Sequence, residues 1–176
     1  MNKRCFYFVE GECEETLINA LKKDPAKIIP GRVKKWNVID RVLPNSILNT
    51  IQPGSIVVLV FDTDVQSSGF LEKNIQMLKK IVSKVLIVCL PQVLHLEDEL
   101  ERCTDVKNVK ELTKSKSRSD FKRDFCRLTD CRQALDIHHI DIGRMWAQPL
   151  PEGFSSFSPY VYHRKLILIR CRQEKK

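Results

Sequence analysis

The sequence lacks three features that would place it in a familiar class: a long apolar run, a paired-cysteine motif and a nucleotide-phosphate loop. No apolar run approaches the roughly 18 to 20 residues of a membrane-spanning helix, so no membrane partner is expected. No Gly-x-x-x-x-Gly-Lys-Ser/Thr loop occurs, so any ATPase activity would have to come from a partner protein. The apolar patch at residues 6–9 is too short for a secretory signal, which makes a cytoplasmic location the expectation.

The seven cysteines contain no Cys-x-x-Cys motif. Their odd number, without a signal sequence, predicts reduced thiols rather than disulfides. Cys126 and Cys131 lie near His138 and His139 in the sequence, so a zinc site formed by these four residues is one interpretation. Their spacing fits no familiar zinc module, and scattered core or surface thiols are the other interpretation.

Apolar periodicity predicts alternating strands and helices. Strands are expected at residues 4–9, near 35–39, at 55–61, at 84–90 and at 165–169. Helices are expected at residues 12–23, 44–50, 70–83, 94–103 and 120–137. The run 55–61 is apolar on both faces, as in a central parallel strand covered by helices on both sides. This order predicts an α/β fold with a mainly parallel, Rossmann-like sheet flanked by helices.

The chain length suits one domain with one sizeable core. We place an α/β domain at residues 1–110 and a basic C-terminal extension, partly helical and partly extended, at residues 111–176, packed on the same domain. Pro91 is expected to stop the strand before it, and Ser119 or Asp120 to cap the helix at residues 120–137. Residues 146–159 are rich in proline and serine and are expected to form an extended surface connection.

Positive charge is in excess and is concentrated in two segments. The formal net charge is +8. One basic segment lies between residues 107 and 132, and the other between residues 163 and 176. The first contains the candidate nucleic-acid contacts Lys114, Lys116, Arg118, Lys122 and Arg123. Basic patches of this size suit a polyanion, and a solvated surface is the alternative.

Two acidic clusters each follow an apolar, strand-like run. Glu10 and Glu14 come just after residues 4–9, and Asp62 and Asp64 come just after residues 55–61. The carboxyl ends of parallel strands face a common crevice, so these side chains can converge although about fifty residues separate them. Carboxylate oxygens are the ligands that hard divalent cations such as Mg²⁺ prefer, so these four residues are the candidate metal ligands.

These motifs resemble the Toprim domain, which is shared by topoisomerases, bacterial primases, ribonuclease-like maturases and OLD-type nucleases. The likeness rests on a strand ending in Val9-Glu10-Gly11 followed by a hydrophobic strand ending in Asp62-Thr63-Asp64. The Glu-Gly-x-x-Glu spacing of residues 10–14 is more similar to OLD-type nucleases than to topoisomerases. The resemblance covers roughly residues 4–90.

The resemblance implies that Glu10 serves as general acid or base and that Asp62 and Asp64 hold Mg²⁺ or Mn²⁺. Glu14 lies one helical turn after Glu10 and is a candidate ligand of a second ion. Glu97 follows the strand at residues 84–90 and is a further candidate ligand, with an exposed acidic helix as the alternative interpretation. Trp36 and Trp146 are interpreted as core residues, with stacking on nucleic-acid bases as the alternative for both.

The function that follows is a small Mg²⁺-dependent nuclease that hydrolyses phosphodiester bonds in DNA or RNA. The likeness to OLD-type nucleases implies a prokaryotic defence or mobile-element system. A topoisomerase is disfavoured because no tyrosine-bearing cleavage domain fits the remaining length, and a full primase because its zinc module is missing. The alternative is a nucleic-acid-binding or regulatory Toprim protein without turnover, which acts with a partner ATPase.

Overall fold

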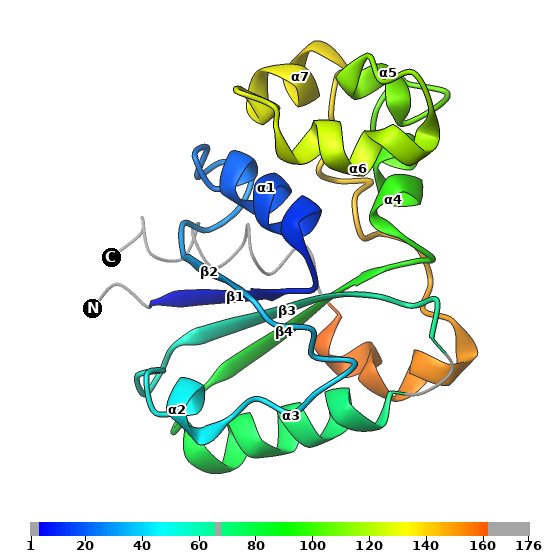
Figure 1. The fold of residues 1–176 in the computed structure, drawn as a ribbon. Coiled ribbons are helices and arrows are strands. Elements are labelled where there is room, and N and C mark those ends of the chain that lie inside the picture. The colour runs from blue at the N-terminus through cyan, green and yellow to red at the C-terminus, as the bar shows by residue number, and fades with distance from the viewer. Residues whose placement is uncertain (1–3, 66–67, 162–176) are drawn as a thin grey trace.

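The computed structural model describes residues 4–65 and 68–161, which form a parallel sheet between two helical layers (Figure 1). The sheet contains β1 (Cys5–Val9), β2 (Arg32–Lys35), β3 (Ile56–Asp62) and β4 (Leu86–Gln92), in the order β2-β1-β3-β4. Each of these neighbours pairs in parallel. The predicted α/β fold with a parallel sheet is therefore confirmed. The strand expected at residues 165–169 lies outside the described residues.

Helices cover both faces of the sheet. One face carries α1 (Glu12–Leu21), α4 (Leu96–Cys103), α5 (Lys110–Thr113), α6 (Arg118–Cys126) and α7 (Cys131–Ile137). The other carries α2 (Asn45–Leu48), α3 (Gly69–Ile81) and the 3-10 helix η1 (Glu152–Tyr160). Figure 1 shows α1, α4 and the α5–α7 group on one side of the sheet and α2 and α3 on the other. Within the described ranges, no helix is long and apolar enough to cross a membrane.

Alternating side chains of the strands fill two cores. Tyr7 of β1 and Val58 of β3 pack in the core beneath α1, α4 and α6. Phe8 and Leu59, one residue further on, pack in the core over α3 and η1. Successive strand residues point to opposite faces, so a strand buried on both sides must be apolar throughout. This is why the run in β3 is continuous and why β1 and β3 occupy the middle of the sheet.

The chain changes its winding direction between β1 and β3. From β1 it passes through α1 to β2 on one side, and from β3 it passes through α3 to β4 on the other. The two crossover helices lie on opposite faces. In open α/β sheets the crevice outside the carboxyl ends of the strands at such a switch point is the usual ligand site. Glu10 and Asp62 occupy these two strand ends.

Two strand expectations are wrong in detail. The strand expected near residues 35–39 lies at Arg32–Lys35, and the last hydrogen bond to β1 runs from the Trp36 N–H to the Val9 carbonyl at 2.7 Å. Val38 and Ile39 turn away from the sheet into the core that contains α3. Pro91 lies inside β4 instead of stopping it. β4 is the last strand of the described sheet, with one isolated bridge on its other edge between Cys89 and Val161, and a residue without an N–H is tolerated in such a position.

Three expectations for the C-terminal part are also wrong. Residues 120–137 form α6 and α7 instead of one helix, because Asp130 accepts a hydrogen bond from the Gln133 N–H at 3.0 Å and so begins a new helix. Ser117, rather than Ser119 or Asp120, caps α6, since its Oγ accepts from the Asp120 N–H at 3.2 Å. The expected surface connection at residues 146–159 contains most of η1, with Phe154 and Phe157 buried.

Glu99 of α4 ties the β4–α4 connection to the segment that follows α7. Its side chain is fully buried. One carboxylate oxygen accepts from the Val93 N–H at 3.1 Å and from the Arg102 guanidinium at 2.7 Å. The other accepts from the Trp146 N–H at 3.0 Å. This carboxylate therefore fixes the chain that leaves the carboxyl end of β4.

Replacing Glu99 should destabilise the protein strongly. Glu99→Ala removes the acceptor of the Val93 and Trp146 backbone N–H groups and the charge that pairs with Arg102, and losing one partner of such a buried pair costs about 3 to 5 kcal/mol. Urea unfolding measures the change in free energy. Glu72→Ala, an exposed glutamate on α3 whose side chain bonds to Gln76, is the control and should cost less than about 0.5 kcal/mol. Equal effects of the two substitutions would contradict the role of Glu99.

Candidate metal centre

Acidic side chains gather where β1, β3 and β4 end. Glu10 follows β1, and Asp62 is the last residue of β3. The carboxylate of Glu10 accepts a hydrogen bond from the Asp62 N–H at 3.4 Å, so the two strand ends are in contact. The predicted convergence of Glu10 and Asp62 across the sheet is therefore what the fold produces.

Asp62, Asp64 and His95 form a three-residue cluster at this edge. Each offers one ligand atom, and these atoms all lie within 4.8 Å of one another. Nδ1 of His95 lies 3.6 Å from an oxygen of Asp62 and 3.7 Å from an oxygen of Asp64. Sequence reasoning missed His95, although it follows β4 and precedes α4 directly. His95 could have been predicted from its position, because it is a polar residue just after a third parallel strand, β4.

Glu14 and Glu97 lie deeper beside this cluster. Both side chains are buried. The Glu14 carboxylate accepts from the Gly11 N–H at 2.9 Å and so caps the start of α1. The Glu97 carboxylate lies 3.4 Å from Nζ of Lys122 on α6. Glu97 is thus a paired, buried acid, and its interpretation as part of an exposed acidic helix is wrong.

Burial, together with crowding by neighbouring acids, raises the pKa of several of these carboxyl groups. Burial raises the pKa of Asp62 to about 8, and the nearby charges of Glu10, Glu14, Asp64 and Glu97 contribute to that rise. Burial also raises the pKa of Glu10, with further contributions from neighbouring acids and against the lowering effect of the Asp62 N–H. The pKa of Glu14 is raised mainly by burial. Without a counter-charge, the Asp62 carboxyl group is therefore not fully ionised near neutral pH.

The residues present fit a divalent cation. Oδ1 of Asp62 is buried and has no hydrogen-bond partner among the residues described. Buried polar atoms are almost always paired, so an orphaned carboxylate oxygen needs an explanation. A cation beside Asp62 would supply both the missing partner for Oδ1 and the missing positive charge. Asp62 and Asp64 provide the oxygen ligands typical of Mg²⁺ and Mn²⁺, and His95 adds a nitrogen ligand that is more usual for transition metals.

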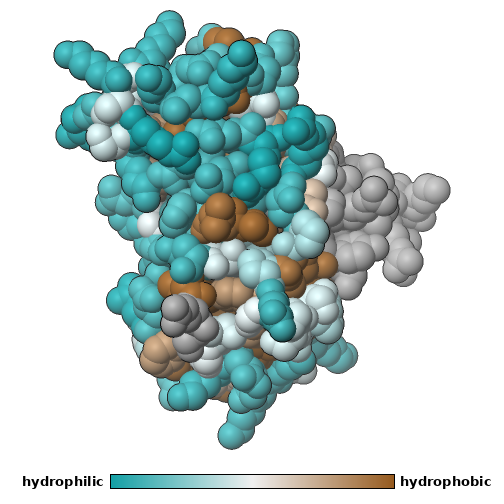
Figure 2. Space-filling model, turned by 90° about the vertical axis from the view of Figure 1, so that its right-hand side faces the viewer, coloured by the Kyte–Doolittle hydropathy of each residue, from teal (hydrophilic) through white to brown (hydrophobic). Residues whose placement is uncertain are grey.

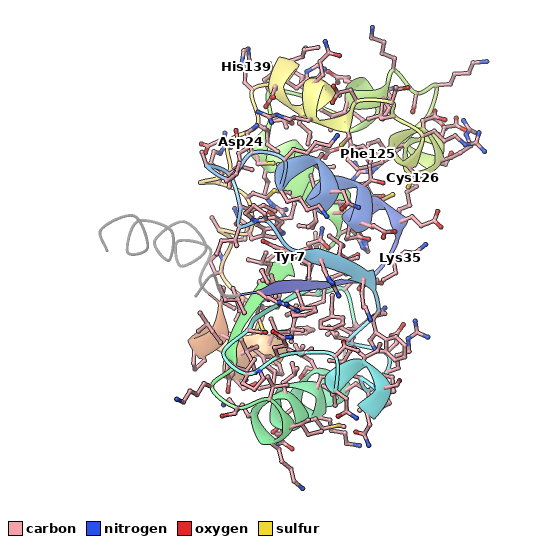
Figure 3. All side chains as sticks on the ribbon, turned by 90° about the vertical axis from the view of Figure 1, so that its left-hand side faces the viewer. Tyr7, Asp24, Lys35, Phe125, Cys126 and His139 are labelled. Atoms are coloured by element: carbon pink, nitrogen blue, oxygen red, sulfur yellow. The ribbon has the colours of Figure 1, made fainter. Side chains whose placement is uncertain are left out.

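A cleft of about 670 Å³ opens beside the acids. Glu10, Glu14 and Asp62 line it on the side of the sheet and α1. Lys122, Arg123 and Arg127 of the α6 region line it on the opposite side. Figure 3 shows α6 lying over α1, with Phe125 and Cys126 on the side of α6 toward α1. Acidic side chains of the sheet edge and α1 and basic side chains of the α6 region, which are distant in the sequence, therefore line the same cleft.

The structure separates the five predicted nucleic-acid contacts into two groups. Lys122 and Arg123 line the cleft. Arg118 instead forms ion pairs with Asp98 and Glu101 of α4, at 3.3 and 2.9 Å. Lys114 and Lys116 are exposed but do not line this cleft. Arg127, which does line it, was not among the predicted contacts, and the second basic segment at residues 163–176 lies outside the described residues.

The interpretation of a zinc site is wrong. Sγ of Cys126 lies 3.3 Å from Sγ of Cys13 on α1, while Cys131 is buried on its own helix. His138 contacts Asp105, with Nδ1 3.0 Å from the carboxylate. Across residues 4–65 and 68–161, the three-residue group at Asp62 is the single cluster with metal-ligand spacing.

The two tryptophans differ in their surroundings. Trp146 is buried in the core beneath α1 and α4, as its core interpretation predicts. Trp36 is partly buried against the other core, and the Arg41 guanidinium lies 4.0 Å from the centroid of its ring. Arg41 therefore covers part of the surface that Trp36 would offer to a base.

Comparisons with protein-family models, with curated proteins and with solved structures find no match to this chain. The geometry of the sheet edge and of the cleft therefore carries the functional argument.

The raised pKa of Asp62 predicts how stability depends on pH in the metal-free protein. The folded state holds this proton up to about pH 8, whereas the unfolded chain releases it near the usual value of 3.8. Unfolding thus releases a proton between these values, so the free energy of unfolding falls as the pH rises through this window. Asp62→Asn should exceed the wild type in stability by roughly 2 to 5 kcal/mol at pH 8 and by little at pH 4.

Urea unfolding in EDTA at the two pH values measures this difference. Glu12→Gln, which alters an exposed acid on α1, should leave the pH dependence as in the wild type. Added Mg²⁺ or Mn²⁺ should stabilise the wild type more than Asp62→Asn, because only a ligand that binds the folded state raises the free energy of unfolding. If the free energy of unfolding depends on pH in the same way in the wild type and in Asp62→Asn, the raised pKa of Asp62 is contradicted.

Proposed function

We propose that this chain is a metal-dependent nuclease, as its resemblance to Toprim nucleases implies. The observation that carries the proposal is the pairing of two features across one cleft. Asp62, with its unpartnered buried oxygen, belongs to an acid cluster on one side, and cationic residues line the other. Phosphodiesters of nucleic acids are anionic, so they can approach carboxylates only where positive charge compensates for the repulsion.

Asp62 and Asp64 are the residues that would hold Mg²⁺ or Mn²⁺, with His95 as a third ligand. The ion would supply an electrophile that polarises a phosphoryl oxygen and lowers the pKa of bound water. His95 favours Mn²⁺ over Mg²⁺ as the better activator, because imidazole is a softer ligand than carboxylate. Glu14 and Glu97 are already engaged by the Gly11 N–H and by Lys122, so they shape the charge of the site rather than completing it.

Glu10 is the proposed general acid or base. Its carboxylate is held in place by the Asp62 N–H, and burial keeps its pKa above the usual value. A pKa closer to the working pH makes a group more effective in proton transfer. Glu10 also lines the cleft, where it can exchange a proton with an attacking water or a leaving oxygen.

Lys122, Arg123 and Arg127 are proposed to hold the phosphates on either side of the bond that is cut. Of these, Lys122 also faces Glu97 and Arg123 pairs with Asp120 and Asp124. Arg127 follows the end of α6 and is exposed. These cations contact the sugar-phosphate backbone, which fixes the position of the strand without reading its sequence.

Substitution of Glu10 or Asp62 should abolish cleavage while leaving the fold intact. Glu10→Gln and Asp62→Asn keep the size of each side chain and remove the charge or the transferable proton. A loss of about a hundredfold or more is expected for each. The measurement is cleavage of labelled single-stranded and duplex DNA and RNA with Mg²⁺, Mn²⁺ or EDTA, with far-UV circular dichroism to monitor folding.

Glu72→Gln is the matched control, because Glu72 is an exposed acid on α3 whose side chain bonds to Gln76 and which does not line the cleft. It should cleave at about the wild-type rate. Wild-type rates in Glu10→Gln or Asp62→Asn would contradict the mechanism. Metal-independent binding with no cleavage by the wild type would instead favour a non-catalytic protein that acts with a partner ATPase.

The cleft also predicts which basic residues contact the phosphates. Arg127→Ala should weaken binding of all sequences similarly and reduce the slope of log K against log salt by about one. Lys116→Ala removes an exposed lysine that does not line the cleft and should leave the slope unchanged. Fluorescence anisotropy with a labelled oligonucleotide over a series of salt concentrations measures both. Equal effects would show that a broader surface binds the strand.

A further inference from the structure

Exposed apolar side chains occur in the segments that leave the carboxyl ends of β3 and β4. Val65, Phe70 and Leu94 are among the few large hydrophobic residues exposed in the described part of the chain, and Leu94 is 54% exposed. Val65 directly follows Asp64, and Leu94 directly precedes His95. Phe70 lies in the first turn of α3, the helix that follows the end of β3. We call these three residues the apolar lip.

The position of Leu94 is fixed by its backbone. Leu94 has a φ of 71°, a left-handed conformation that a leucine rarely adopts. Its N–H donates to Oγ1 of Thr63 at 3.2 Å, and that hydroxyl donates to the Gln92 carbonyl at 3.1 Å. Strained residues of this kind persist where the surroundings hold them, and they concentrate at functional sites. The structure therefore holds a leucine in solvent between the ends of β3 and β4.

The apolar lip and the cations flank the acids from different sides. Lys122, Arg123 and Arg127 come from the helical layer above α1, whereas Phe70 belongs to the layer of α3 on the other face of the sheet. Figure 2 views the side of the molecule where the strands end. Its upper part, over the α5–α7 group, is mostly teal, and brown atoms gather in the middle and lower parts.

We propose that the substrate is an unpaired nucleic-acid strand, whose phosphates face the α6 cations and whose bases rest on the apolar lip. This inference rests on the proposed nuclease function. A duplex presents phosphates and sugars on its outside and keeps the faces of its bases stacked, so it offers nothing to an apolar surface. An unpaired strand exposes charge and base faces together, and proteins bind such strands by combining cations with apolar or aromatic platforms.

Binding of a strand with and without its bases tests this assignment. The probes are a fluorescent single-stranded oligonucleotide, the same strand with a central run of abasic nucleotides, and a hairpin duplex. Binding is measured with Ca²⁺ in place of Mg²⁺ to slow cleavage. The wild type should prefer the intact single strand over both other probes by at least about fivefold.

Phe70→Ala and Leu94→Ser should lose this preference, binding the intact and abasic strands about equally, while keeping the affinity of the wild type for the abasic strand. A purely structural role of these residues would lower both affinities alike. Ile137→Ala is the control, because Ile137 is an exposed apolar residue on α7 that does not line the cleft. It should retain the full preference of the wild type.

Several outcomes would overturn the inference. Tighter binding of the hairpin, or equal binding of abasic and intact strands by the wild type, would do so. Cleavage is then measured with Mn²⁺ in place of Ca²⁺. Faster cleavage of the duplex than of the single strand would leave the nuclease proposal standing while removing the single-strand assignment, whereas no cleavage with Mn²⁺ and no binding of any probe would remove both. Self-association that Leu94→Ser abolishes would assign the apolar lip to a second copy of the chain.

Discussion

Burial and mutual repulsion among carboxylates at the carboxyl edge of the sheet are the constraint on which the rest of the site depends. Asp62 has three acidic neighbours from the β1 and β4 sides, and its own strand carries Asp64 two residues on. Each neighbour makes it harder for Asp62 to ionise in a buried position. Folding tolerates this arrangement only with protons, cationic side chains or a bound cation in place. The nearby Lys122 supplies part of that charge, and the unpartnered oxygen of Asp62 marks where more is needed.

The fold creates this crowding through its topology. Parallel pairing of β1 with β3 and of β3 with β4 brings three carboxyl ends to one edge, and the switch of winding direction leaves that edge uncovered by a crossover. Glu99 then fixes the chain after β4, which places His95 and Leu94 beside Asp62. Packing of α6 on α1 brings the cations across from the acids. Stability and candidate function are therefore coupled, because the contacts that hold the layers together also set the charges in the cleft.

Three of the four strands and the acidic side of the site could be predicted from the sequence. Continuous apolar runs identified β1, β3 and β4, and acids placed just past them identified Glu10 and Asp62, because both patterns depend on local geometry. The break between α6 and α7 was not predicted, because the short polar stretch between them is compatible with a continuous helix. The break depends on Asp130, whose side chain caps the start of α7. His95, the Cys13–Cys126 contact and the choice of Arg127 over Lys116 depend on how distant segments pack. Such tertiary contacts have no periodic signal in one sequence.

The central claim is that the acid cluster at the end of β3 binds a divalent cation. Anomalous diffraction from crystals soaked in millimolar Mn²⁺ tests it most directly, since the manganese signal locates the ion without assumptions about activity. The account predicts one strong peak about 2 Å from a carboxylate oxygen of Asp62, with Asp64 in the same coordination shell. An edge without a manganese peak, or a peak bound elsewhere while the carboxylates at this edge remain unchanged, would contradict it.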